Sequence, residues 1–113
     1  MSQKYRQPIK GLTVLGSREF RCDFYSIGFL ALSVGRSVQR VLVWEKKGII
    51  PPTPFRNYGG ERLYTQEMIE HIRKATQNGV KGENAKNIRI DLDDEWERMF
   101  GDWRRGMVRV VPQ

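Results

Sequence analysis

Two short amphipathic stretches, separated by one glycine-containing turn, constrain the fold of this chain more than any other feature. Ser26 is placed to cap a first helix over residues 27–33, which Gly35 is placed to end. Ser37 is placed to cap a second helix, which runs to about Lys47. Two short helices joined by such a turn are typical of a helix-turn-helix.

A loop rich in proline and glycine follows these helices and predicts a wing. We expect Ile49–Ile50 and residues 62–64 to pair as two very short strands around it. Thr65 is placed to cap a third helix, which ends at about Gln77. The predicted fold is therefore α+β: a winged helix-turn-helix with short wing strands and an additional C-terminal helix.

The sequence on either side of residues 25–78 is expected to be accessory. Residues 1–24 are interpreted as a basic N-terminal arm, flexible over residues 1–11, and patterning around Gly16-Ser17 suits a short hairpin. Residues 79–113 are interpreted as a linker followed by a tryptophan-rich helix and strand.

Within this C-terminal segment, three elements are expected. The linker spans residues 79–90 and ends in a short strand at residues 88–90. A fourth helix follows from Asp91 to about Arg105, because acidic residues crowd its first turn and arginines its last. Residues 107–111 are expected to form a terminal strand.

Composition narrows the class of partner. The chain of 113 residues carries a net charge of +7, which suits nucleic acid, an anionic membrane or an acidic protein. No apolar run approaches the roughly 18 residues that span a bilayer, so no membrane partner is expected. The single cysteine, Cys22, and the absence of a secretory signal favour the cytoplasm.

The residue patterns do not favour an enzyme. No paired carboxylates, nucleophile–base set or phosphate loop stand at usable spacing, and no Cys/His cluster has zinc-ligand spacing. His71 is a lone histidine on a helix, and we expect it to be packed or solvated. We therefore expect no catalytic residues, no metal and no cofactor.

Residues 25–72 resemble the DNA-binding domain of the mercury-resistance-regulator (MerR) family. The resemblance rests on Tyr-Ser-Ile-Gly-Phe-Leu-Ala, Val-Gly-Arg-Ser-Val-Gln, Trp-Glu-Lys-Lys-Gly-Ile-Ile-Pro and Glu-Arg-Leu-Tyr-Thr-Gln-Glu-Met-Ile, in that order. The stretch is also similar to the winged helices of phage excisionases and of some phage small terminase subunits. The resemblance implies a partner, double-stranded DNA, with the second helix in the major groove.

The resemblance also implies roles for individual residues. Gln39 and Arg40 would reach base edges, because Gln can pair with adenine and Arg with guanine through two hydrogen bonds each. The wing would follow the DNA backbone or minor groove, although a salt bridge to Glu45 or Glu61 is an alternative for Arg62, and packing in the core is an alternative for Tyr64. The full expected DNA-binding set is Arg36, Ser37, Gln39, Arg40, Lys46, Lys47, Arg56, Arg62 and Tyr64.

Three functional hypotheses remain open at this point. The first is a sequence-preferring DNA-binding protein that regulates transcription, and the second is a phage-type DNA-architectural factor. The third is an adaptor for self-association or for a protein partner, which would bind through Trp96, Phe100 and Trp103 of the C-terminal helix. The same three aromatic residues could instead pack back onto the domain.

Overall fold

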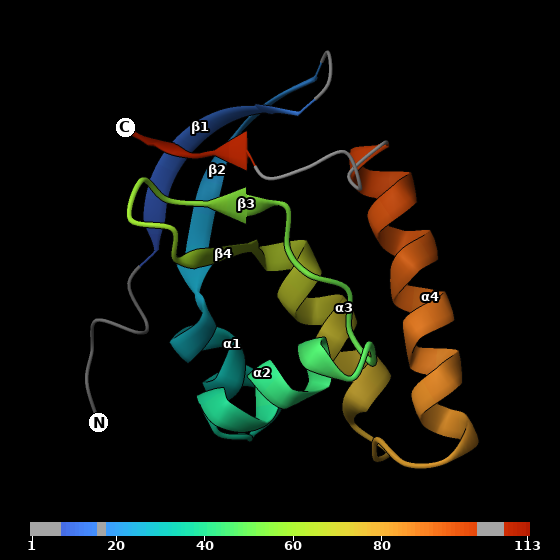
Figure 1. Cartoon of the computed structure of the whole chain (residues 1–113). Helices are drawn as coiled ribbons and strands as arrows, with labels where there is room; N and C mark the ends of the chain where they lie inside the picture. The colour runs from blue at the N-terminus through green and yellow to red at the C-terminus, as the bar shows by residue number, and fades with distance from the viewer. Residues whose placement is uncertain (1–7, 16–17, 102–107) are drawn as a thin grey trace.

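The computed structural model describes residues 8–15, 18–101 and 108–113, and places six strands and four helices there. Figure 1 shows α1 and α2 below the sheet and α4 beside it, with α3 between them. The elements are β1 (Ile9–Leu15), β2 (Arg18–Ser26), α1 (Ile27–Val34), α2 (Val38–Lys46), β3 (Phe55–Arg56), β4 (Arg62–Thr65), α3 (Gln66–Thr76), α4 (Glu83–Phe100), β5 (Val108–Arg109) and β6 (Val111–Pro112).

All six strands belong to one sheet, in the order β5-β3-β4-β2-β1-β6. The pairing of β3 with β5 is parallel, and the other pairings are antiparallel. Strands β5 and β6 lie on opposite edges of this sheet, yet Val110 alone separates them in the chain. The sheet must therefore curl until its two edges nearly meet (Figure 1). The Thr13 hydroxyl donates a hydrogen bond of 2.8 Å to the Arg109 carbonyl across this junction.

This sheet shows that the predicted fold class is wrong. The chain is a mixed α/β fold with a six-stranded, nearly closed sheet and four helices, and not a winged helix-turn-helix with short wing strands. The difference arises at β2, which continues to Ser26 and pairs with β4 through Tyr25 opposite Tyr64. The N-terminal hairpin and the expected wing strands therefore share one sheet.

The local predictions for residues 1–26 are partly corrected. A hairpin around Gly16-Ser17 is confirmed, because all of β1 pairs with residues 18–24 of β2 on the other side of these two residues. The predicted arm lies partly outside the described residues, and its last part is wrong, because β1 begins at Ile9. The strand therefore begins earlier than predicted and includes Gly11, a residue that weakens a strand but is tolerated in one.

The expected strand at Ile49–Ile50 is also wrong. Ile50 is buried, but this pair follows α2 as a turn in which the Ile49 N–H donates to the Trp44 carbonyl at 2.8 Å. Prolines have no N–H donor, so residues 51–54, three of them prolines, are poorly suited to a sheet ladder. Pairing with β4 begins at Phe55, directly after the last of them.

The fourth helix begins eight residues earlier than we predicted, so the strand at residues 88–90 and most of the linker are wrong. The apolar residues Ile88, Leu92, Trp96 and Phe100 recur every four residues and are all buried. This spacing places them on one side of a single long helix. The Ile-Arg-Ile alternation that suggested a strand is the first part of that pattern.

The first three helices are confirmed close to their predicted limits. The hydroxyls of Ser26, Ser37 and Thr65 each accept a hydrogen bond from the N–H three residues later, at 3.1 to 3.3 Å. Gly35 ends α1 with φ of 69°, a conformation that favours glycine. The terminal strand is confirmed as two short strands, β5 and β6.

Aromatic rings dock α4 against the sheet. The Phe100 ring lies edge-on to the rings of Phe20 and Phe55, with centroids 5.6 and 5.2 Å apart. Trp96 is fully buried beside them. The prediction that Trp96 and Phe100 form a partner-binding surface is therefore wrong, because both side chains are used by the core. Trp103 lies outside the described residues.

Candidate nucleic-acid interface

The exposed side of helix α2 and its two ends carry cations, with the half-buried Val43 between them. Its inner residues Val41 and Trp44 are buried in the core, which fixes the orientation of the helix. The outward residues follow spacings of three and four, which place them on one face. This face and the residues at the helix ends contribute the exposed side chains of Arg36, Gln39, Arg40, Lys46 and Lys47.

The start of α2 is held by local hydrogen bonds. The Ser37 hydroxyl accepts the N–H of Arg40 at 3.1 Å, so this predicted DNA contact is first of all a helix cap. The Arg36 guanidinium donates to the Gly35 carbonyl at 3.1 Å, while its side chain stays at the surface. These bonds position Arg40 at the exposed beginning of the helix.

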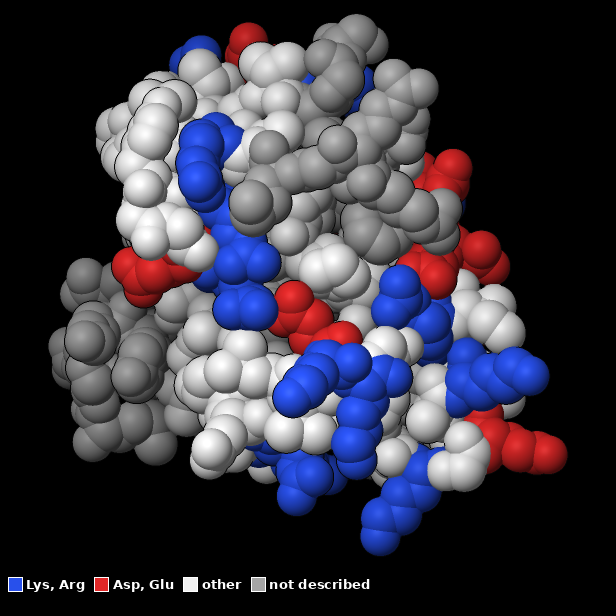
Figure 2. Space-filling view, in the orientation of Figure 1, with Lys and Arg blue, Asp and Glu red and all other residues white. Residues whose placement is uncertain are grey.

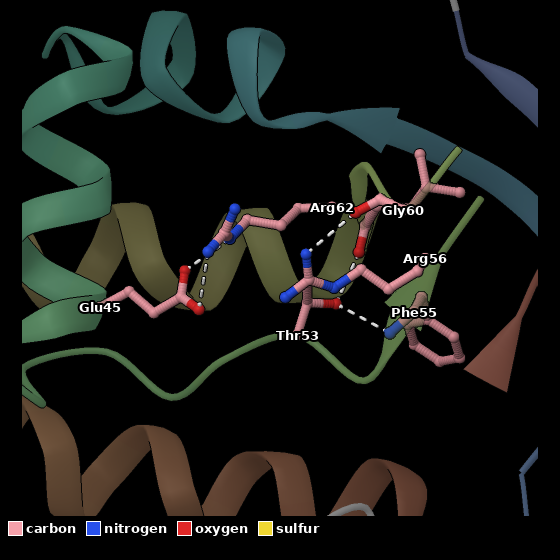
Figure 3. Close-up of polar contacts among 7 residues, drawn as sticks. Glu45, Thr53, Phe55, Arg56, Gly60 and Arg62 are labelled. Atoms are coloured by element: carbon pink, nitrogen blue, oxygen red, sulfur yellow. Dashed lines mark hydrogen bonds and ion pairs between the residues drawn. The ribbon is translucent and has the colours of Figure 1, made fainter. Parts of the chain in front are cut away.

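The strongest ion pair beside α2 joins Glu45 to Arg62 of β4. The Arg62 Nε–H and Nη2–H donate to the two Glu45 oxygens at 2.6 and 3.3 Å, as Figure 3 shows. This hydrogen bond with Glu45 raises the already high pKa of Arg62, although partial burial opposes the shift. The structure therefore places Arg62 in the salt bridge that was the alternative to DNA contact. The bridge also ties α2 to β4.

Tyr64 does not belong to any exposed interface. Its side chain is 1% exposed, and burial raises its pKa, with Glu45 adding to the effect. A phenol in this position cannot reach a phosphate from outside the protein. The prediction of Tyr64 as a DNA contact is therefore wrong, because its side chain is enclosed in the core, as are those of its neighbours Leu63 and Thr65.

The β3–β4 hairpin brings two further arginines to one place. The Arg56 Nη1–H donates to the Gly60 carbonyl across the turn at 3.1 Å (Figure 3). Arg109 lies opposite Arg56 in the parallel pairing of β3 with β5, and its Nη1–H donates to the Asn57 carbonyl at 3.3 Å. Arg109 was missed by sequence reasoning, because no local sequence pattern indicates that residue 109 lies beside residue 56.

The charges on this face are concentrated. Figure 2 shows Lys and Arg side chains gathered over the lower part of the molecule, around α2 and the start of α4, and in a separate column over β3 and its neighbours. Red carboxylates lie between the two groups. Glu45 is the acidic residue of α2, and its bidentate contact with Arg62 offsets its charge. The exposed side of α2 is therefore strongly positive.

The remaining candidate groups do not form a second site. The His71 Nε2 lies 3.3 Å from Glu95, in a contact between α3 and α4. Over the described ranges, the His, Cys, Asp and Glu side chains form no group of three that could hold a metal ion. Those same ranges contain no helix with the length and apolar character needed to cross a membrane.

Comparisons with known protein families, with curated proteins and with solved structures found no match for this chain. The interface is therefore interpreted from its own geometry and charge.

Proposed function

We propose that this chain binds double-stranded DNA, with α2 in the major groove. The observation that carries the proposal is the basic exposed side of α2 described above, on a helix whose opposite side is anchored by Val41 and Trp44. An α-helix fits the major groove, which is about 12 Å wide. Cations along such a helix are attracted to the phosphates on both walls of the groove.

The side chains of α2 divide between two kinds of contact. Gln39 and Arg40, near the start of the helix, have the functional groups that pair with adenine and guanine edges. Lys46 and Lys47, at its end, are suited to phosphates as flexible point charges. Val43 lies half-buried between these pairs, so few base hydrogen bonds are available. We therefore expect a moderate preference between sequences and a large electrostatic contribution to affinity.

The β3–β4 hairpin supplies a second, sequence-independent contact. Arg56 and Arg109 lie side by side in the sheet, and each is held by a backbone carbonyl of the hairpin turn. Guanidinium groups suit phosphate oxygens, to which they can donate two hydrogen bonds. In this arrangement the hairpin follows the DNA backbone or minor groove next to the groove that holds α2.

Fluorescence anisotropy with labelled duplexes tests the proposal. The purified chain is titrated with a random-sequence duplex and with DNA from its own genomic neighbourhood, across a salt series. We expect binding at low salt and a steep loss of affinity as salt rises. Arg40→Ala should cost about 1–3 kcal/mol of binding free energy and relax the preference at one base pair.

Lys74→Ala is the matched control. Lys74 is also an exposed cation on a helix, but it lines a surface hollow with Asp91, Asp94 and Glu95, away from α2. We expect this variant to bind as the unchanged chain does. Absence of binding at low salt would overturn the proposal, and so would equal losses from the two substitutions.

A further inference from the structure

A second feature of the basic face lies on the side of α2 away from the hairpin. A surface hollow there is bounded by Arg36, Arg40 and Trp44 of the α2 region and by the turn between α3 and α4. The turn contributes residues 78–81, and the first part of α4 contributes Asn84. The buried Trp44 is the part of this lining that belongs to the core.

The lining of this hollow has the chemistry of an anion site. Arg36, Arg40 and Lys81 are all exposed cations, and Asn78 and Asn84 add neutral amide donors. None of the described residues that line it is acidic. The hollow between α3 and α4 that contains Lys74 is different, because three of its lining residues are carboxylates.

The backbone of the turn fixes where Lys81 lies. Gly79 and Gly82 have φ of 103° and 61°, in the left-handed region that residues with a Cβ rarely adopt. Two such residues on either side of Val80 and Lys81 define the path of the turn. Lys81 lines the hollow from the α3–α4 turn, whereas Arg36 and Arg40 line it from the α2 region.

We propose that this hollow binds one backbone phosphate of the DNA duplex, with Lys81 and Arg36 as its cations. The inference rests on the proposed function and deepens it. Arg40 also lines the hollow, from the first turn of α2, and remains the base-reading residue of the proposal. Phosphate contacts then flank α2 on both sides, at the hairpin and at the α3–α4 turn, and together they fix the depth and angle of the helix in the groove.

The first test compares salt dependence. Lys81→Ala should weaken binding to native and random duplexes alike, by about threefold to tenfold, and should lower the slope of log K against log salt by about 0.9. Lys81→Arg should restore most of the affinity, since the charge is kept. Lys74→Ala is again the control, because Lys74 is an exposed cation that lines the acidic hollow between α3 and α4 and not this one.

The second test locates the phosphate. Each backbone phosphate of the duplex is replaced in turn by a neutral methylphosphonate, and both the unchanged chain and Lys81→Ala are titrated. We expect one position at which the substitution weakens the unchanged chain but not the variant. Identical sensitivity of the two proteins at every position would overturn the inference.

The two proposals fail in different ways. If the chain binds DNA and Arg40→Ala weakens that binding while Lys81→Ala matches Lys74→Ala, the phosphate site is wrong and the DNA-binding proposal stands. If the unchanged chain binds no duplex at low salt, both are wrong.

Discussion

Gly11 is the position where the closure of the sheet can be tested most directly. A Cβ added there would come closer than 3.0 Å to Val110 Cγ1, and would lie 3.2 and 3.3 Å from two ring carbons of Phe24. Gly11 is not among the glycines with positive φ, so alanine has no backbone strain at this position. The effect of Gly11→Ala is therefore steric.

The expected magnitude follows from two opposing effects. Overpacking a dense core typically costs about 1–3 kcal/mol. Replacing glycine by alanine also restricts the unfolded chain, which stabilises the fold by about 0.4–1 kcal/mol where the backbone allows it. We expect Gly11→Ala to lower the free energy of unfolding by roughly 1.3 kcal/mol, the difference between the midpoints of these two ranges. Urea denaturation followed by tryptophan fluorescence measures it.

A double-mutant cycle separates this reasoning from a general loss of stability. Val110→Ala removes two buried methyl groups and should cost about 2–3 kcal/mol, including the cavity that it leaves. The added Cβ of Gly11→Ala would fill part of that cavity, so the double variant should be more stable than the sum of the single effects by about 1 kcal/mol or more. Val111→Ala, at an exposed neighbouring residue, is the control. Additive effects within experimental error would refute the proposed contact between β1 and residue 110.

Three further outcomes are expected. Glu45→Gln removes the charge that holds Arg62, so it should lower the free energy of unfolding by roughly 1–2 kcal/mol. The same substitution should raise DNA affinity. Denaturation measures the first effect and fluorescence anisotropy the second. The hydrogen bond from Arg98 lowers the pKa of Glu95 below 4.5. The ionised Glu95 therefore stabilises the fold fully above pH 4.5, and this contribution is lost as the pH falls through the lowered pKa. Between pH 6 and pH 3, the Glu95→Gln variant should lose less stability than the unchanged chain. Partial burial, with Glu67 and Asp23 adding to the effect, raises the pKa of the Cys22 thiol to about 11. The rate of its alkylation should therefore keep rising past pH 9, and a plateau near pH 8.5 would contradict this expectation.

The sequence was most informative where structure is decided locally. Ser26, Ser37 and Thr65 were each identified as helix caps, and each one makes the expected bond to the N–H three residues later. Such signals act within one turn of helix and need no knowledge of the rest of the chain. The start of α4 carried no comparable signal, because its N-cap is Gly82 and no side chain caps it.

The sheet could not be predicted as a whole because its decisive pairings join distant residues. The parallel register of Phe55 with Val108 crosses half the chain. A terminal strand over residues 107–111 was expected, but nothing in the sequence indicates which strand it pairs with. Without that pairing, β3 and β4 look like an isolated wing. The error in fold class follows from this missing contact and from the pairing of β2 with β4, which the sequence did not indicate either.

The candidate site likewise combines residues that could be predicted from the sequence with residues that only the tertiary fold brings together. The outward residues of α2 were expected from the family resemblance together with helical spacing, and the Glu45–Arg62 bridge was one of the alternatives that the sequence left open. The burial of Tyr64 and Trp96 was not readable, because each ring has an apolar body and a polar atom that suit a core or an interface equally. Arg109 and Lys81 reach the basic face through tertiary contacts, although the glycines around Lys81 are a local hint.

The segment Val108–Pro112 forms both edge strands of the sheet, because β5 pairs with β3 and β6 pairs with β1. This arrangement has a consequence for how the chain folds. During synthesis the other strands are complete before this segment has emerged, and until then β1 and β3 each present an unpaired edge to the surroundings. The Thr13–Arg109 hydrogen bond spans 96 positions of sequence, and contacts of such separation form late and slowly. We therefore expect the nascent protein to be most prone to aggregation just before its last strands are available, and a chain truncated before residue 108 to retain that vulnerability permanently.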